Sequence, residues 1–167
     1  MAVLESKYRL IQGEALALFP ALEDASVDGI FADPPYSSGG AFRSDRSGVT
    51  TSKYQTTDTK KDYPEFSGDN RDQLAYYYWS ALWMSEAERV LKPGRVCCVF
   101  TDWRQLSVTI NAFQVGGFVF RGVIPWNKTE AARPTRGRFR AQCEYVVWGT
   151  NGPMDEQTEE CLPGFFS

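Results

Sequence analysis

Histidine is absent from this chain of 167 residues. A Ser-His-Asp triad, a Cys-His dyad and any zinc site with a histidine ligand are therefore excluded. A group that accepts a proton near neutral pH must then be a carboxylate, or a backbone or amide oxygen. We therefore expect Asp and Glu side chains to carry out any acid–base catalysis in this protein.

Long apolar runs and spaced cysteine pairs are also missing. No stretch approaches the roughly 18 apolar residues of a membrane span, and the beginning of the chain shows no signal-peptide pattern. The four cysteines contain no CxxC pair, so we expect reduced, buried thiols in an intracellular protein and no metal site. The cysteines are Cys97, Cys98, Cys143 and Cys161.

The apolar periodicity predicts one α/β domain. Strands are expected at 8–12, 27–32, 95–100, 118–126 and 143–148, and helices at 15–19, 72–91 and from about 102 to 115. Strands and helices in this order are typical of a mostly parallel sheet flanked by helices. The spacing in the longest helix predicts a core-facing stripe, whose members are Leu74, Tyr77, Tyr78, Ala81, Leu82, Val90 and Leu91.

A polar stretch at 37–70 interrupts this pattern, and its positive and negative charges cancel. Loops of this length within a domain are usually functional or flexible. Two interpretations remain open: a flexible linker, or a flap that faces the substrate. The second draws on the position of the stretch, which begins directly after Tyr36.

Asp33, Pro34, Pro35 and Tyr36 follow an apolar strand and carry most of the functional information. The carboxyl ends of strands are where α/β sheets place their ligands. The prolines stiffen the turn, since neither can continue a central strand. A carboxylate and a carbonyl can accept both N–H bonds of an exocyclic amine while a tyrosine ring stacks on the base. The turn therefore suits a planar base with an amino group.

A basic segment lies between positions 128 and 140, with a net charge of +4 in a chain whose total is −3. Arginine and lysine contacts to phosphate dominate nucleic-acid affinity, so the segment is a candidate DNA contact. The alternative is a solvated surface loop, and Arg140 could instead pair with Glu144. The candidate residues are Lys128, Arg133, Arg136, Arg138 and Arg140.

With these motifs in place, the chain resembles the amino-group DNA methyltransferases that use S-adenosylmethionine. Asp33-Pro34-Pro35-Tyr36 looks like their catalytic motif. The similarity covers nearly the whole chain and includes positions 13–16, 91–94, 100–105, 121–128 and 138–149. The order of the motifs is similar to the permuted beta group of these enzymes.

The resemblance implies a Rossmann-like methyltransferase fold, with residues 1–167 as a single catalytic-half domain. It implies a site-specific enzyme of the restriction-modification type, acting on DNA in the cytoplasm of a bacterium or of a phage host. Asp rather than Ser at position 33 favours adenine N6 as the target. The implied catalytic residues are Asp33, Pro34, Pro35 and Tyr36, and the implied cofactor-binding residues are Gly13, Glu14, Asp33 and Pro34.

Other targets stay open at this point: the N4 amine of cytosine, an RNA base, or a protein glutamine amide. An interpretation of another class is a catalytically incomplete DNA-binding remnant. Its support is that no GxGxxG occurs in the sequence, whereas the family has a glycine-rich cofactor loop. Glu14 also stands where the family usually has Asp.

In the family, the glycine-rich loop follows the motifs found here. Residues 150–167 are therefore expected to be a tail that leads to this loop, either in a longer protein or with a partner chain that completes the site. The resemblance also implies two further strands, which would lie in the sheet between the strands expected at 8–12 and 27–32. They would come from that longer protein or partner chain. Without them, the sheet would have exposed edges.

Overall fold

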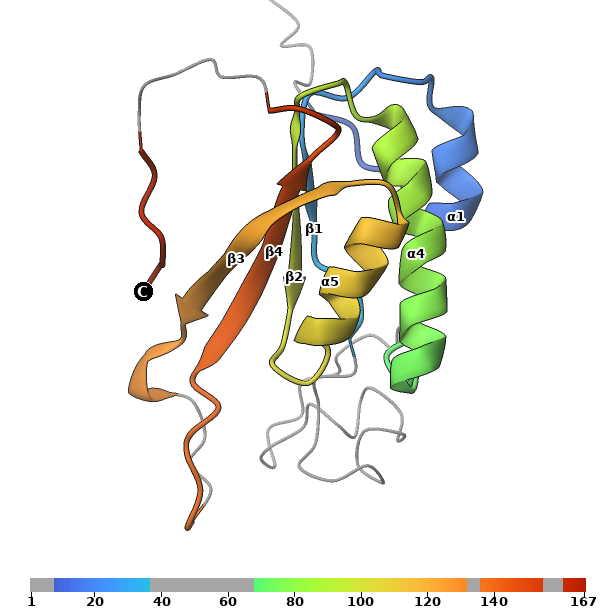
Figure 1. Cartoon of the computed structure of the whole chain (residues 1–167). Coiled ribbons are helices and arrows are strands. Elements are labelled where there is room, and N and C mark those ends of the chain that lie inside the picture. The colour runs from blue at the N-terminus through green and yellow to red at the C-terminus, as the bar shows by residue number, and fades with distance from the viewer. Residues whose placement is uncertain (1–7, 37–67, 132–135, 155–160) are drawn as a thin grey trace, which may run out of the picture.

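The computed structural model describes residues 8–36, 68–131, 136–154 and 161–167. Figure 1 shows one twisted sheet with its helices gathered on one face. The strands lie in the order β1 (Ile30–Ala32), β2 (Val96–Thr101), β4 (Cys143–Thr150) and β3 (Val119–Asn127). The helices are α1 (Ala15–Leu18), α4 (Gln73–Val90) and α5 (Leu106–Val115), with short 3-10 turns at Phe19–Ala21 and Thr129–Ala131.

Three of the four strands run in the same direction, and β4 runs against them. β1 pairs with β2 in parallel, whereas β4 is antiparallel to both β2 and β3. The reason lies in the connections: α5 carries the chain back between β2 and β3, but β3 and β4 are joined as a long hairpin. The carboxyl ends of β1, β2 and β3 therefore meet the amino end of β4, and we call this end of the sheet the carboxyl edge (Figure 1).

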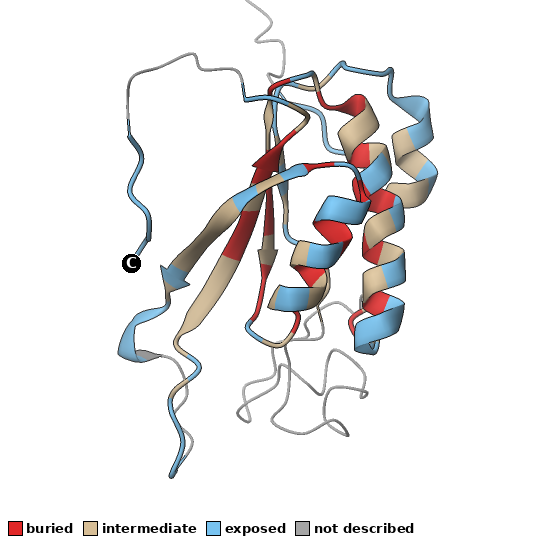
Figure 2. Ribbon diagram, in the orientation of Figure 1, coloured by how far each residue is buried: buried red, intermediate tan, exposed pale blue. Residues whose placement is uncertain are grey.

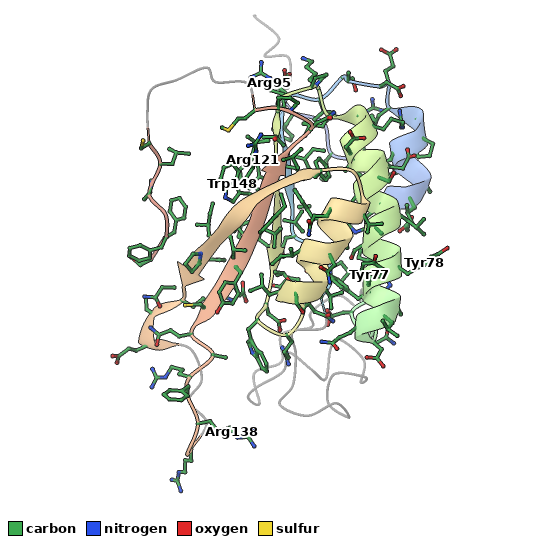
Figure 3. All side chains as sticks on the ribbon, in the orientation of Figure 1. Tyr77, Tyr78, Arg95, Arg121, Arg138 and Trp148 are labelled. Carbon is green, nitrogen blue, oxygen red and sulfur yellow. The ribbon has the colours of Figure 1, made fainter. Side chains whose placement is uncertain are left out.

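The core lies between the sheet and the two longer helices, and Figure 2 shows the buried positions concentrated there. The helix predicted at 72–91 is confirmed as α4, and the Asp72 carboxylate caps its first turn by accepting from Gln73 N at 2.8 Å. The predicted core stripe is right for Val90 and Leu91, which are fully buried, but wrong for its most exposed members. Leu74 is 83% exposed and Tyr78 is 69% exposed, and Tyr78 points away from the sheet in Figure 3.

The residues of α4 that are buried instead are Tyr76, Ser80, Trp83, Met84, Ala87 and Val90. This helix has apolar side chains on more than one side, so helical spacing fits two different stripes. Packing against α5 and the sheet selects between them, and that packing is a tertiary property. Periodicity therefore predicted the helix correctly but only part of its buried face.

The strand predicted at 8–12 is wrong as well. These residues, which the structure describes, have no regular secondary structure, and Leu10 is 92% exposed. The reason is that a strand needs a neighbour for its backbone hydrogen bonds. Among the described residues, β1 pairs with β2 on one side and with nothing on the other. The apolar pattern of 8–12 thus has no partner within this sheet.

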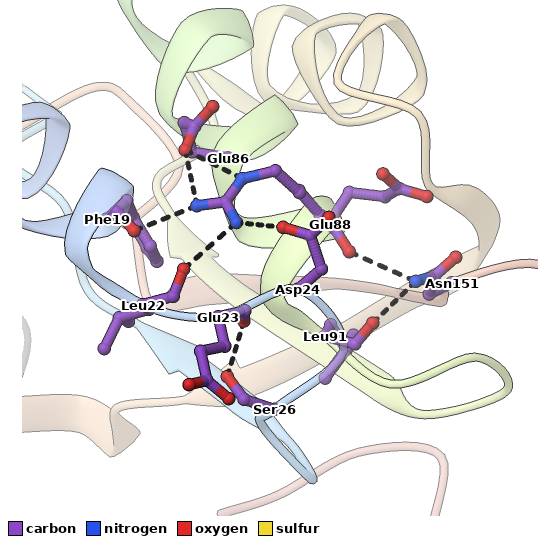
Figure 4. Close-up of polar contacts among 10 residues, drawn as sticks. Phe19, Leu22, Glu23, Asp24, Ser26, Glu86, Glu88, Leu91 and Asn151 are labelled. Atoms are coloured by element: carbon purple, nitrogen blue, oxygen red, sulfur yellow. Dashed lines mark hydrogen bonds and ion pairs between the residues drawn. The ribbon is translucent and has the colours of Figure 1, made fainter.

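The end of the sheet opposite the carboxyl edge is tied by hydrogen bonds between distant segments (Figure 4). Arg89 of α4 donates to the carbonyls of Phe19 at 2.9 Å and Leu22 at 3.1 Å, and also pairs with Asp24. Asn151, just after β4, donates its side-chain amide to the carbonyl of Leu91 at 2.7 Å. The Arg89 bonds hold the segment that leads into β1, and the Asn151 bond joins the end of β4 to the end of α4.

Two of the four cysteines are buried. Cys97 and Cys98 are buried as expected, and burial raises the pKa of both thiols. Cys143 is half-buried and Cys161 is exposed, so the expectation of burial is wrong for these two.

Of the expected tail at 150–167, residues 150–154 and 161–167 are described, and the backbone of Phe166 pairs with the outer edge of β3.

Two expectations concern features the structure describes in part. Of the predicted loop at 37–70, residues 37–67 lie outside the described residues, so neither the linker nor the flap is tested. No helix among the described residues is long and apolar enough to cross a membrane.

Candidate active site at the carboxyl edge

The Asp33–Tyr36 turn leaves β1 at the carboxyl edge, as the sequence predicted. Ala32 is the last residue of β1 and pairs with Val99 of β2. Pro34 is buried, Pro35 and Tyr36 are half-buried, and Asp33 is exposed as a whole residue. The two prolines lack backbone N–H donors, so the backbone hydrogen bonding between β1 and β2 ends at this point. The turn is thus held at the rim of the sheet.

A pocket of about 690 Å³ opens beside this turn. It brings together all four residues that the resemblance implied for cofactor binding, which are Gly13, Glu14, Asp33 and Pro34. Its volume is in the range of small-molecule sites. The other lining residues come from the segment before α1, from β1 and from α4: Gln12, Ala15, Phe19, Ile30, Phe31, Ala32, Pro35, Arg71, Trp79 and Trp83.

Residues near and on α4 supply a wall of this pocket that sequence reasoning missed. The Arg71 guanidinium lies 4.1 Å from the centroid of the Trp79 ring, a cation–π contact. The indole nitrogens of Trp79 and Trp83 have no hydrogen-bond partner among the described residues. The pocket thus offers a carboxylate at Glu14, the Arg71 guanidinium and the half-buried ring of Trp79. These groups suit a ligand with a planar ring, hydroxyls and separated charges.

Asp33 lies in an unusual electrostatic setting. Partial burial and the nearby carboxylate of Glu144 raise the pKa of Asp33, and Lys128 opposes this shift. Burial disfavours the charged form of a carboxylate, and a like charge disfavours it further. Perturbed carboxylates of this kind are typical of functional sites.

Tyr36 lies within the same group of charges. The pKa of Tyr36 is raised by burial first, and then by the negative charges of Glu144, Asp33 and Asp102. The phenol therefore stays neutral and keeps its proton to donate. Asp102 is itself paired, since Arg104 Nε donates to its carboxylate at 2.7 Å.

Glu144 is the site residue that sequence reasoning did not select. It lies near the start of β4, pairs in register with Trp126 of β3 and forms an ion pair with Lys128. Arg140, the predicted alternative partner for Glu144, instead donates to the carbonyl of Glu130. The sequence predicted a mostly parallel sheet without a direction for the strand at 143–148, so the beginning of β4 was not placed at this edge. The antiparallel direction of β4 brings Glu144 there.

The basic residues differ in their surroundings. Arg136 and Arg138 are exposed on the hairpin between β3 and β4, and Arg138 projects beyond the sheet in Figure 3. Lys128 is held by Glu144, and Arg140 by the Glu130 carbonyl. Arg133 lies outside the described residues. Within the part of the chain that is described, no group of three or more His, Cys, Asp or Glu residues could hold a metal ion.

Comparison with known proteins decides the family. The family model N6_N4_Mtase, described as DNA methylase, matches residues 27–158, which span β1 through β4 and the turn after β1. This chain belongs to the N6_N4_Mtase DNA methylase family. The resemblance predicted from the turn and the flanking motifs is thus confirmed.

Two relatives place the chain within the DNA methylases. It is 30% identical over 130 residues to the type II methyltransferase M.HpaI of Haemophilus parainfluenzae, covering 77% of this chain and 34% of M.HpaI. It is 27% identical over 139 residues to YubD of Escherichia coli, covering 83% of this chain and 51% of YubD. The chain therefore spans between a third and about half of the length of these relatives.

Solved structures of DNA methylases share the fold. The cytosine-N4-specific PvuII DNA methyltransferase matches with a TM-score of 0.60 and 16% identity, over 92% of this chain and 54% of that one. The complex of M1.HpyAVI with S-adenosylmethionine matches with a TM-score of 0.53 and 14% identity, over 92% and 64%. The predicted Rossmann-like fold, present here in part as a mixed sheet with helices, is confirmed.

Proposed function

We propose that this DNA methylase transfers a methyl group from S-adenosylmethionine to the N6 amine of adenine in DNA. The observation that carries the proposal is the rigid Asp33–Tyr36 turn at the carboxyl edge, beside a pocket of about 690 Å³. In bacteria, an enzyme with this substrate would work in the cytoplasm. The proposal assigns the pocket to the cofactor and the outer side of the turn to the base.

The pocket fits the chemical parts of S-adenosylmethionine. The Glu14 carboxylate accepts a hydrogen bond from Ala17 N through Oε2 at 3.2 Å, and its other oxygen can accept from ribose hydroxyls. The Trp79 and Trp83 rings offer apolar surface for a planar base. When bound, the cofactor supplies an electrophilic methyl group. Gly13, Glu14 and Pro34 would hold it next to Asp33.

The turn would orient the target amine. The Asp33 carboxylate and the Pro34 carbonyl accept the two N–H bonds, which directs the nitrogen lone pair toward the cofactor side. Tyr36 stacks on the base after the base leaves the duplex. This chemistry needs no covalent intermediate, so the buried thiols of Cys97 and Cys98 take no part.

DNA would be held by the hairpin between β3 and β4. Arg136 and Arg138 are exposed there and are suited to phosphate contacts. Arg140 and Lys128 already have partners within the chain and would contribute less. The hairpin projects from the same edge as the turn, so both could face one duplex (Figure 1).

The second candidate is transfer to the N4 amine of cytosine. It is favoured by the similarity in fold to PvuII methyltransferase, which is cytosine-N4-specific. Both bases present an exocyclic amine, so the same two acceptors would serve either. Asp rather than Ser at position 33 is the reason to prefer adenine.

One experiment separates the candidates. Unmethylated DNA of mixed sequence is incubated with the protein and methyl-labelled S-adenosylmethionine, and its nucleosides are then analysed by mass spectrometry. Labelled N6-methyladenine is the expected product. Labelled N4-methylcytosine would support the second candidate. Absence of both products, in a preparation that binds DNA, would contradict the proposed enzyme and favour a catalytically incomplete DNA-binding protein.

A further inference from the structure

Arg71 lines the pocket at the carboxyl edge, and the proposed function assigns no part of the ligand to it. It is half-buried and stands just before the residue that caps α4. The start of α4 is tied to the turn after β2, because the Gln73 side-chain amide donates to the Arg104 carbonyl at 3.0 Å. The backbone that carries Arg71 is therefore anchored at the carboxyl edge.

Two contacts orient the Arg71 guanidinium on this backbone. Its Nη1 donates to the Gly68 carbonyl at 2.8 Å, and its Cζ lies over the Trp79 ring, 4.1 Å from the centroid. The Trp79 ring packs in turn against Tyr76 and Trp83, with a distance of 6.1 Å between ring centroids in both pairs. A long side chain is thus held in one place, which lowers the entropy cost of binding a ligand.

The backbone at Gly68 is fitted to this guanidinium. Gly68 has a φ of +94°, a left-handed conformation that favours glycine. A Cβ atom added at this position would lie 2.0 Å from Arg71 Nη1, so any other residue would displace the guanidinium or the turn. The position of the guanidinium therefore depends on glycine at 68.

The charges around the pocket favour one kind of ligand for Arg71. Partial burial lowers the pKa of Arg71, and a partly buried guanidinium is stabilised by an anion that accepts from its donors. Carboxylates and phosphates are the anions that match these donors. Glu14 and Asp33 line the same pocket, and their carboxylates would repel a polyanion such as a DNA backbone. An amino-acid carboxylate is accompanied by an ammonium group, so it fits this mixture of charges.

We propose that Arg71 binds the carboxylate in the amino-acid part of S-adenosylmethionine, with Trp79 and Gly68 as positioning residues for the guanidinium. This inference rests on the proposed function, which assigns the pocket to this cofactor. A guanidinium has five N–H donors, so it can bind a carboxylate while it keeps its bond to the Gly68 carbonyl. Arg71 thereby makes the pocket selective for ligands that carry the carboxylate, while Glu14 accepts from the ribose.

The test compares two compounds that differ only in this carboxylate, S-adenosylmethionine and decarboxylated S-adenosylmethionine. Calorimetric titration into the full chain should show that S-adenosylmethionine binds about tenfold more tightly, the effect of a hydrogen bond to a charged group. Arg71→Met should weaken the binding of S-adenosylmethionine about tenfold and leave that of the decarboxylated compound within a few fold. The selectivity between the two compounds should therefore disappear in this variant.

Three further variants separate ligand binding from a structural role of Arg71. Arg71→Lys keeps the charge but not the fork of donors, so its selectivity should lie between those of the wild type and Arg71→Met. Gly68→Ala keeps Arg71 but displaces its guanidinium, so it should also reduce the selectivity. Arg95→Met removes an equal charge at the opposite end of the molecule (Figure 3) and should change neither affinity. A purely structural role of Arg71 would instead weaken the binding of both compounds equally.

Different results would overturn the two proposals. Unchanged selectivity in Arg71→Met, equal losses for both compounds, or a wild-type chain that binds neither compound would overturn the role of Arg71. If Arg71→Met leaves both affinities unchanged but flattens the slope of log affinity for duplex DNA against log salt, the guanidinium binds a phosphate instead. A wild-type chain that binds S-adenosylmethionine with the expected selectivity but transfers no methyl group to DNA would contradict the proposed function and leave the role of Arg71 standing.

Discussion

The two ends of β1 carry one aspartate each, and their surroundings are opposite. Asp28, before the strand, pairs with Lys92 at 2.6 Å, and this partner lowers the pKa of Asp28. Asp33, after the strand, is partly buried beside the carboxylate of Glu144, and its pKa is raised. Only Gly29 and the three residues of β1 separate an aspartate stabilised as an ion from one whose charge is opposed.

The same contrast extends across the whole sheet. At the end with Asp28, polar side chains such as Arg89 and Asn151 bind backbone carbonyls and join distant segments (Figure 4). At the carboxyl edge, the negative charge of Glu144 raises the pKa of both Asp33 and Tyr36. Polar groups at the first end stabilise the fold. Those at the second end keep unusual charge states that a reaction can use.

Replacing each aspartate of β1 is the strongest test of this contrast. Asp33→Ala should abolish methyl transfer, because it removes an acceptor aimed at the reacting amine. DNA binding should stay within a few fold of wild type, since phosphate contacts lie on the hairpin. Asp28→Ala is the matched control and should transfer at nearly the wild-type rate. Assays of labelled methyl incorporation and of duplex binding check both statements, and near-normal transfer by Asp33→Ala would refute the role of the turn.

Tyr36 gives the next largest expected effect. Tyr36→Ala should weaken transfer more than Tyr36→Phe or Tyr36→Trp, because stacking on a base is worth roughly 1–3 kcal/mol. The ratio kcat/KM of the three variants measures this order. Equal losses in the Ala and Phe variants would mean that the hydroxyl matters and the ring does not.

The exposed arginines of the hairpin should have a smaller effect, and one that depends on salt. Arg136→Ala and Arg138→Ala should each reduce the slope of log affinity against log salt by roughly 0.9 for duplex DNA. Binding should weaken about equally for different sequences, because phosphates carry no base identity.

Two further variants calibrate that measurement. Arg140→Ala should have a weaker effect, since its guanidinium is bound to the Glu130 carbonyl. Arg95→Ala lies at the opposite end of the molecule (Figure 3) and should leave the slope unchanged. If Arg136→Ala and Arg138→Ala also leave it unchanged, the hairpin makes no phosphate contacts. A loss confined to one DNA sequence would mean that these arginines contact bases.

Asn151→Ala should reduce stability and leave methyl transfer unchanged, the opposite of what is predicted for Asp33→Ala. Its amide donates to the carbonyls of Leu91 and Glu88 at the end of α4, so its loss should lower the free energy of unfolding by about 1–2 kcal/mol. Methyl transfer per folded molecule should be unchanged. Denaturant titration measures the first quantity. Gln114→Ala, which removes an exposed amide bond to the Ile110 carbonyl, should change stability by less than about 0.5 kcal/mol.

Local signals explain what the sequence could predict. The turn at Asp33–Tyr36 and the helix α4 depend on neighbours in the chain: two prolines in one case, periodicity and the Asp72 cap in the other. The prediction that Gly13 and Glu14 share a site with Asp33 came from the family resemblance, which carries tertiary information indirectly. These features were therefore accessible without coordinates.

Features set by distant contacts could not be read in this way. The buried face of α4 depends on α5 and the sheet, and the pattern at 8–12 lacks a strand to pair with among the described residues. Glu144 reaches the site because β4 runs antiparallel, which no local pattern encodes. Its signal in the sequence was a lone acidic residue at the start of an apolar strand. That signal is common to many surface strands.

The most direct test of the central claim, that the carboxyl edge is a cofactor-dependent reaction site, is a calorimetric titration of S-adenosylmethionine into the full chain. The account predicts binding at one site per molecule, about tenfold weaker in Glu14→Ala because a hydrogen bond to a charged group is lost, and unchanged in Asp28→Ala. No binding to the wild-type chain, or equal binding by the wild type and Glu14→Ala, would contradict it.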